Sequence, residues 1–272
     1  MHTRFAAHSF TSLVDPTFSP VEYSHLKFGS DAVARKYGHE LAAAFFKRHS
    51  TVLLSSKCVV IPSPYNYVRN AATVLTGHFV QALNHLLVSA NGQHVEYSTI
   101  HRKVSYISDY GFLPKEKRKS LIDQDSFYLH KDFYKDKVLI FVDDVIITGT
   151  HEEKVKEILV REGLPNRAFF LYYAQYLGNN PEIEAEINFA GIKSVVDYCH
   201  FLTKTKQHHI IVRPIKFMLA LPSRKLRQVL QHLSPGDLRE LYYGCLGEGY
   251  YKLPQYHAAF KIVARKVKML EQ

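Results

Sequence analysis

The stretch VLIFVDDVIITGTH, residues 138–151, decides the fold. Its first five residues are apolar, which is typical of a strand buried on both faces of a parallel sheet. Two acids, Asp143 and Asp144, come next, and a Thr-Gly-Thr turn then leads into the amphipathic segment EEKVKEILVREG. The pattern predicts a strand, a tight turn and a helix. It places both carboxylates at the carboxyl end of the strand, where open α/β sheets bind their ligands.

The chemistry of this stretch suits a phosphorylated sugar. A turn that opens a helix presents backbone N–H groups and hydroxyls to an anion at the positive end of the helix dipole, so it can hold a phosphate without a lysine. Two nearby carboxylates can accept hydrogen bonds from the vicinal hydroxyls of a ribose, or hold a Mg²⁺ ion that bridges them to a second phosphate. The stretch therefore predicts a binding site for a ribose 5-phosphate.

These fourteen residues closely resemble the signature of type I phosphoribosyltransferases, which bind 5-phosphoribosyl 1-pyrophosphate (PRPP). The resemblance implies that the two acids contact the ribose 2- and 3-hydroxyls and that the turn binds the 5-phosphate. The positions concerned are Asp143 and Asp144 for the ribose, and Thr148, Gly149, Thr150 and His151 for the phosphate. Two residues depart from the family pattern, because Ile147 replaces a small residue and His151 replaces Thr or Ser. The alternative is an ordinary strand-to-helix turn with an Asp N-cap, which seldom needs two acids before TGT.

The resemblance also implies a pyrophosphate loop that follows an earlier strand. The segment CVVIPSPYNYVRNAA is the candidate, because it begins with a predicted strand and precedes residues 138–151. Arg69 and Asn70 stand where a helix begins, and an Arg with free N–H groups at a helix start is a suitable partner for pyrophosphate. Ser63 and Tyr65 are neighbouring candidates. A surface loop punctuated by prolines, with a solvated Arg69, is the alternative.

Residues 101–137 are the most polar region, and the stretch 101–120 within it lies where the resemblance implies a loop that closes over the site. Cations there could neutralise the departing pyrophosphate while the loop excludes water. The candidates are Arg102, Lys103, Tyr106, Lys115, Lys117 and Arg118. A solvated run of charges is the alternative for any single lysine.

The fold class expected is α/β, with a mostly parallel sheet flanked by helices, like a type I phosphoribosyltransferase, and an additional helical C-terminal subdomain. Further strands are predicted at 58–61, 168–177 and 192–201, and helices at 31–50, with Asp31 as N-cap, and at 71–87. We divide the chain into three parts: residues 1–50, the α/β core at 51–205, and the helical subdomain at 206–272. The first part is irregular at first and then helical. It is a candidate for part of the hood, the variable region that recognises the base in the family that the sequence resembles.

Composition limits the class of protein. The 272 residues carry a net charge of +10 and are 46% hydrophobic, which excludes a disordered chain. Basic charge alone leaves nucleic acid, an anionic membrane or a phosphorylated small molecule as partners. Three separated cysteines, no signal peptide and no apolar stretch of membrane-spanning length predict a cytoplasmic protein without a membrane partner. Sixteen histidines include no HExxH metal motif.

Together these features predict a Mg²⁺-dependent enzyme that transfers the phosphoribosyl group of PRPP to a nitrogenous base and releases pyrophosphate. Asp143 and Asp144 are the expected catalytic and metal-binding residues. Candidates for base recognition are Tyr172, Tyr173, Gln175 and Tyr176, together with the C-terminal helices, though buried tyrosines more often belong to a core. The alternative is a non-catalytic regulator that binds PRPP and contacts nucleic acid through its basic surface. A homodimer and a nucleic-acid partner are left open.

Overall fold

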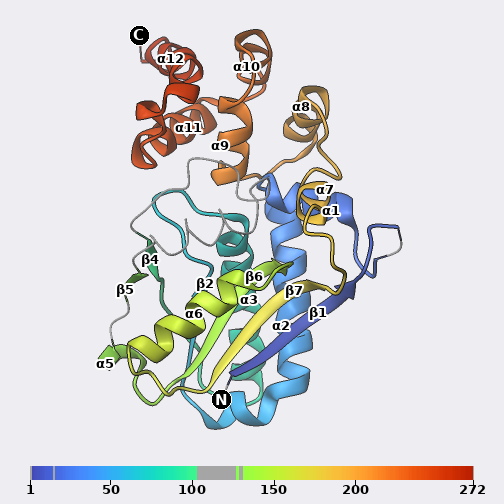
Figure 1. The fold of residues 1–272 in the computed structure, drawn as a ribbon, viewed down its shortest axis with the longest axis vertical. Coiled ribbons are helices and arrows are strands. Elements are labelled where there is room, and N and C mark those ends of the chain that lie inside the picture. Colours follow the sequence, from blue (N-terminus) through green and yellow to red (C-terminus); the bar gives the residue numbers. More distant parts are fainter. Residues whose placement is uncertain (1, 15, 103–126, 129–130, 272) are drawn as a thin grey trace.

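The computed structural model describes residues 2–14, 16–102, 127–128 and 131–271. Its main sheet has five strands, all parallel, in the order β1-β7-β6-β2-β3 (Figure 1). These strands are β1 (His2–Phe10), β2 (Cys58–Pro62), β3 (Glu96–Tyr97), β6 (Val138–Ile146) and β7 (Ala168–Tyr176), and a separate antiparallel pair consists of β4 (His101–Arg102) and β5 (Phe127–Tyr128). The predicted α/β class with a parallel sheet is confirmed.

Two sequence-based expectations about secondary structure are wrong. The chain does not start irregularly, because β1 pairs with β7 at the edge of the sheet. The segment 192–201 is not a strand, because most of it forms α8 (Val195–Lys204). Its buried residues Tyr198, Cys199, Phe201 and Leu202 recur at helical spacing, and the Ser194 side chain caps the first turn.

Helices cover both faces of the sheet, which explains why its central strands are apolar throughout. In β6, Ile140 and Val142 pack toward α2 (Asp31–Ser55) and α3 (Ala71–Ser89). Leu139 and Phe141 point to the other face, which α6 (Thr150–Arg161) covers (Figure 1). Because neighbouring residues of a strand face opposite sides, a strand covered on both sides needs an unbroken apolar run.

The start of α2 differs from the expectation that Asp31 caps it. Ser30 is the N-cap, and its side chain accepts a hydrogen bond from the Val33 N–H. Asp31 instead accepts from the Nε2 atoms of His78 and His209, each at 2.9 Å. Burial opposes ionisation of Asp31, but the hydrogen bonds from His209 and His78 outweigh it and lower its pKa to about 2. Asp31 thus joins α2, α3 and the chain that leads to the C-terminal helices.

Glycine at position 38 lets α2 and α3 approach closely, and this contact yields a prediction. A Cβ at Gly38 would lie 2.8 Å from both the Leu75 carbonyl oxygen and the Phe79 nitrogen. These are backbone atoms, so the helices must move apart, and Gly38→Ala is expected to cost about 2 kcal/mol of unfolding free energy. Gly77→Ala is the control, since a Cβ there meets nothing within 4 Å and should add up to about 1 kcal/mol of stability. Urea unfolding measures the free energy of unfolding of both variants. Equal changes of the same sign would contradict a close contact between α2 and α3 at Gly38.

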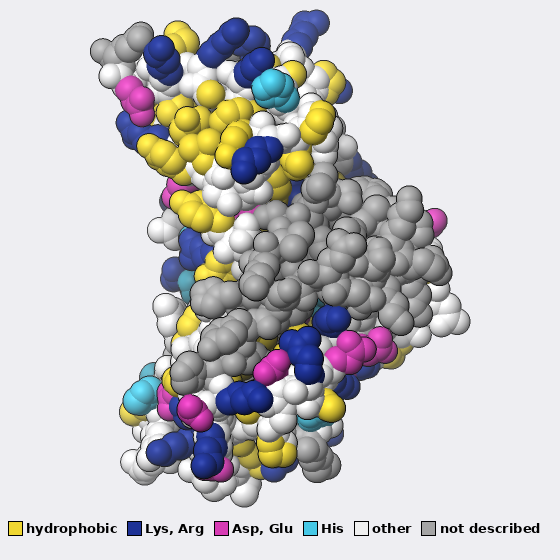
Figure 2. Space-filling view, turned by 60° about the vertical axis from the view of Figure 1, so that its left-hand side comes forward, with side chains coloured by type: hydrophobic (Ala, Val, Ile, Leu, Met, Phe, Trp, Pro, Cys, Tyr) yellow, Lys and Arg dark blue, Asp and Glu magenta, His cyan; other side chains and the backbone are white. Residues whose placement is uncertain are grey.

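The chain after Arg213 is helical, as its sequence predicts, and its buried residues form a separate hydrophobic cluster together with those of α8. The helices of this part are α9 (Val212–Leu219), α10 (Ser223–Val229), α11 (Pro235–Gly247) and α12 (Pro254–Lys268), with a 3₁₀ turn at Tyr250–Lys252. They lie beyond the carboxyl end of the sheet (Figure 1). Their surface carries hydrophobic side chains beside Lys and Arg (Figure 2), and Tyr243, Leu246 and Tyr251 are exposed there.

Three short helices complete the described chain: α1 (Pro20–Lys27), α5 (Lys131–Tyr134) and α7 (Ile183–Asn188). α1 and α7 lie side by side near the carboxyl end of β6 (Figure 1). The Ser24 hydroxyl donates to the Asn188 carbonyl at 2.9 Å and holds the two helices together. Among the described residues, no helix is both long enough and apolar enough to cross a membrane.

Candidate functional site

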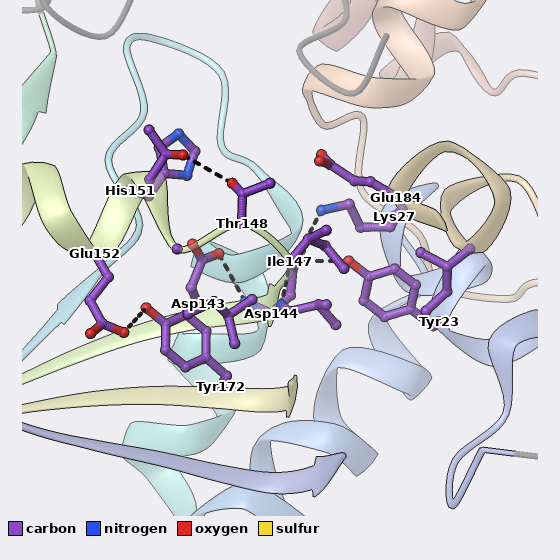
Figure 3. Close-up of a pocket in the computed structure, with 15 residues that line it drawn as sticks. Tyr23, Lys27, Asp143, Asp144, Ile147, Thr148, His151, Glu152, Tyr172 and Glu184 are labelled. Atoms are coloured by element: carbon purple, nitrogen blue, oxygen red, sulfur yellow. Dashed lines mark hydrogen bonds and ion pairs between the residues drawn. The ribbon is translucent and has the colours of Figure 1, made fainter. Parts of the chain in front are cut away.

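Asp144 lies at the carboxyl end of β6 and is buried with three donors around it (Figure 3). Lys27 Nζ lies 2.5 Å from Oδ2, the Tyr23 hydroxyl donates to Oδ1 at 3.1 Å, and the Val145 N–H donates to Oδ1 at 2.7 Å. A carboxylate offers about four acceptor positions. Asp144 is therefore largely committed to partners inside the protein, and Lys27 compensates its charge.

Asp143 is less enclosed than its neighbour. Its Oδ1 accepts from the Asp144 N–H at 2.9 Å, and Ser63 lines the same space beside it. Burial and the adjacent Asp144 charge raise the pKa of Asp143 above its usual range, while Lys27 opposes the rise. A carboxylate with this much remaining acceptor capacity, facing a cavity, can receive hydroxyl groups of a ligand or contribute to a metal site.

The Thr148–Thr150 turn forms the next wall of the same cavity, together with His151. Gly149 is the N-cap of α6 and has φ +76°, a left-handed conformation that favours glycine. The Thr148 and Thr150 hydroxyls hydrogen-bond to each other at 3.0 Å (Figure 3). The first N–H groups of a helix have no acceptor within the helix, so this end of α6 suits an anion.

Glu152 fixes the start of α6 against the sheet. Its buried carboxylate accepts hydrogen bonds from Arg4 Nε at 2.7 Å, from Arg4 Nη2 at 3.1 Å and from Lys156 Nζ at 2.5 Å. The Tyr172 hydroxyl of β7 donates to it at 3.1 Å. Burial would raise the pKa of Glu152, but the hydrogen bonds from Arg4 and Lys156 outweigh it and lower the pKa. The position of the Thr148–Thr150 turn therefore depends on β1 and β7.

The start of α3 meets the two acids across a cavity of about 200 Å³. Asn70 caps α3 by accepting from the Thr73 N–H at 2.8 Å, and its Nδ2 donates to the Pro64 carbonyl at 3.3 Å. Asn70 thereby closes the loop after β2 and lines the cavity. The Arg69 side chain is exposed, while its carbonyl accepts from the Val212 N–H at 3.1 Å.

A comparison with protein families matches residues 1–263 of the chain to the phosphoribosyltransferase family described as PRTase ComF-like. The chain belongs to this family. It is also similar to a solved hypoxanthine phosphoribosyltransferase from Staphylococcus aureus, with 6% identity and a TM-score of 0.33, over 52% of this chain and 73% of the other. No curated protein matches the chain significantly. The resemblance inferred from residues 138–151 is thus confirmed at the level of the family.

Several residues of this PRTase ComF-like site carry no signal in the sequence. Tyr23 and Lys27 come from α1, Glu184 comes from α7, and Arg213 and Lys216 come from α9. Lys27 stands 117 positions before its partner Asp144 in the sequence. None of these three helices contains a recognisable sequence motif. Only the folded chain brings these residues to the end of β6.

The remaining candidates from the sequence fall in two places. Arg102 is the last residue of β4, and Lys103, Tyr106, Lys115, Lys117 and Arg118 lie outside the described residues. Among the strand tyrosines, Tyr173 stacks on Tyr37 with ring centroids 3.7 Å apart, and Tyr176 is buried against Phe10. These two tyrosines therefore pack in the core of the fold.

Proposed function

We propose that this protein is a Mg²⁺-dependent phosphoribosyltransferase that binds PRPP at the carboxyl end of β6 and transfers its phosphoribosyl group to a nitrogenous base. The observation that carries the proposal is that two adjoining pockets share Asp143, Asp144 and His151. The Gly149 turn lines one pocket and the start of α3 lines the other, so a ligand that fills both can contact a diol acceptor, the turn and a second helix start. A cytoplasmic location and a homodimer stay predictions.

Each part of the cavity has a role in the proposed reaction. The N–H groups and hydroxyls of Thr148, Gly149, Thr150 and His151 bind the 5-phosphate at the positive end of α6. Asp143 accepts hydrogen bonds from the ribose hydroxyls, and Asp144 holds it in place through its own backbone N–H. The C1–O bond breaks as the C1–N bond forms, and pyrophosphate leaves with the electron pair. Binding energy at the remote phosphate fixes C1 for this attack.

The donor atoms present suit Mg²⁺ shared with a substrate. Within the described part of the chain, no group of three His, Cys, Asp or Glu side chains is arranged to hold a metal ion. Mg²⁺ commonly binds through one or two carboxylates and completes its octahedron with water and substrate phosphates. Asp143 would supply such a carboxylate, and Asp144, also expected from the sequence, would have to share with the ion an oxygen that already accepts from Lys27, Tyr23 or Val145. The ion would neutralise negative charge on the pyrophosphate.

The proposed activity is tested by following pyrophosphate while the protein is incubated with PRPP, Mg²⁺ and a panel of bases. We expect release that depends on one base and is lost in Asp143→Asn. Binding of PRPP without release across a broad panel would contradict the transferase.

That outcome would favour the second candidate, a PRPP-binding regulator that contacts nucleic acid. The observation behind it is charge, because residues 206–272 hold 12 Lys and Arg against 4 Asp and Glu. A gel-shift assay with RNA and DNA measures nucleic-acid binding directly. A regulator should bind with an affinity that falls steeply with salt and changes when PRPP is added.

A further inference from the structure

The cavity at the end of β6 is not built by the sheet and its covering helices alone. One side consists of Ser63, Asp143 and the start of α3 at Asn70, and the facing side consists of α9. α9 contributes Val212, Arg213 and Lys216, and it packs in the core of the C-terminal helices. The C-terminal part of the chain therefore supplies part of the wall around the candidate ligand.

Two helices begin at this cavity. α3 starts at Ala71, and Ala71 and Ala72 both line the space. α9 starts at Val212, whose N–H donates to the Arg69 carbonyl directly before the N-cap of α3. A helix start carries partial positive charge. The hydrogen bond holds the two positive helix ends beside each other, and neither helix lines the pocket formed by the Thr148–Thr150 turn.

Two cationic side chains stand on the same side of α9, three residues apart, and are partly buried. The Arg213 guanidinium lies 5.5 Å from the Phe189 ring centroid, and Lys216 Nζ lies 6.0 Å from that of Tyr250. These rings restrict where the side chains lie. Glu184 also lines the cavity, and Lys27 is paired with Asp144. Asp143 and Asp144 thus line the cavity from β6, and Arg213 and Lys216 line it from α9.

We propose that Arg213 and Lys216 bind the diphosphate group of PRPP, so that the C-terminal helices complete the active site. The inference rests on the proposed function and adds the residues that recognise the leaving group. If Asp143 holds the ribose and the Gly149 turn holds its 5-phosphate, the adjoining pocket at the starts of α3 and α9 is the space that remains for the C1 substituent. The diphosphate leaves with the electron pair of the C1–O bond, and charge-assisted hydrogen bonds from Arg213 and Lys216 stabilise the added negative charge.

Titration calorimetry with the full chain and Mg²⁺ tests this inference with three probes: PRPP, inorganic pyrophosphate and ribose 5-phosphate. Arg213→Gln and Lys216→Ala should each raise the dissociation constants of PRPP and pyrophosphate at least tenfold. The dissociation constant of ribose 5-phosphate should change less than twofold. Arg213→Lys should recover part of the pyrophosphate affinity. Lys225→Ala is the charge-matched control, because Lys225 is exposed on α10 and should leave all three constants unchanged.

The outcomes separate this inference from the proposed function. Unchanged affinities for pyrophosphate and PRPP in both folded variants would overturn the inference. An equal loss of affinity for ribose 5-phosphate would also overturn it, because it would indicate that the two side chains have a structural role. A thermal melt of each variant checks the fold, and Lys216→Ala decides the matter if Arg213→Gln unfolds. Pyrophosphate binding that depends on Arg213, without any binding of ribose 5-phosphate or PRPP, would support the cationic subsite and contradict the proposed function.

Discussion

Asp143→Asn is expected to weaken PRPP binding about 100-fold without lowering the stability of the protein. The substitution removes the charge from the hydrogen bonds to the ribose hydroxyls, each worth roughly 1.5–3 kcal/mol, and two such bonds account for this loss. The raised pKa of Asp143 means that the fold disfavours its ionised form. A neutral side chain of the same shape relieves this repulsion, so the melting temperature should stay equal or rise.

Asp144→Asn is the comparison that makes this prediction specific. Asp144 and Lys27 are both largely buried, and the substitution leaves the Lys27 ammonium without its carboxylate. We expect a loss of about 3 kcal/mol in unfolding free energy, together with weaker PRPP binding. Urea unfolding and calorimetry on both variants measure the two effects. Equal destabilisation by the two substitutions, or unchanged PRPP affinity in Asp143→Asn, would contradict the separate roles given to the two acids.

Glu152→Ala is expected to destabilise the protein by about 3 kcal/mol. The change leaves the partly exposed Arg4 guanidinium and the buried Tyr172 hydroxyl without their acceptor, and the loss of several hydrogen bonds to a buried carboxylate together costs this much. Glu157→Ala is the matched control, because it changes the same residue type in the same helix at an exposed position and should cost less than about 0.5 kcal/mol. Urea unfolding at pH 7 measures both. Equal costs would show that Glu152 does not anchor α6.

The effect of Glu152 should also depend on pH. Its pKa is lower in the folded protein than its ordinary value of 4.5. The stabilisation is therefore present above pH 4.5 and is lost as the pH falls through the folded pKa, because protonation then favours the unfolded chain. The difference in unfolding free energy between wild type and Glu152→Ala should shrink between pH 5 and pH 3. A constant difference over that range would contradict an ionised Glu152.

The central part of the fold was predictable because its residues act locally. Residues 138–151 hold a strand, its two acids, the turn and the start of the helix in one continuous segment, and the apolar runs of β2 and β7 identify the neighbouring strands. Burial on both faces requires such runs whatever the rest of the chain does. The helical spacing of α3 and α6 likewise reflects their packing on the sheet.

The rest depended on contacts between distant segments. HTRFAAHSF lacks an apolar run because β1 is an edge strand, so nothing local distinguishes it from a loop. In α8 the apolar residues of VVDYCHF suit a strand as well as a helix over so short a window. Lys27 and Arg213 reach the site only through the placement of α1 and α9, which no local pattern records.

The central claim is that the carboxyl end of β6 binds PRPP, and equilibrium calorimetry of the wild-type protein with PRPP and Mg²⁺ tests it most directly. We predict binding of one PRPP per chain, competition by ribose 5-phosphate, and about 100-fold weaker binding in Asp143→Asn. Absence of any binding by the folded wild type, or binding that is unchanged in Asp143→Asn, would contradict the claim.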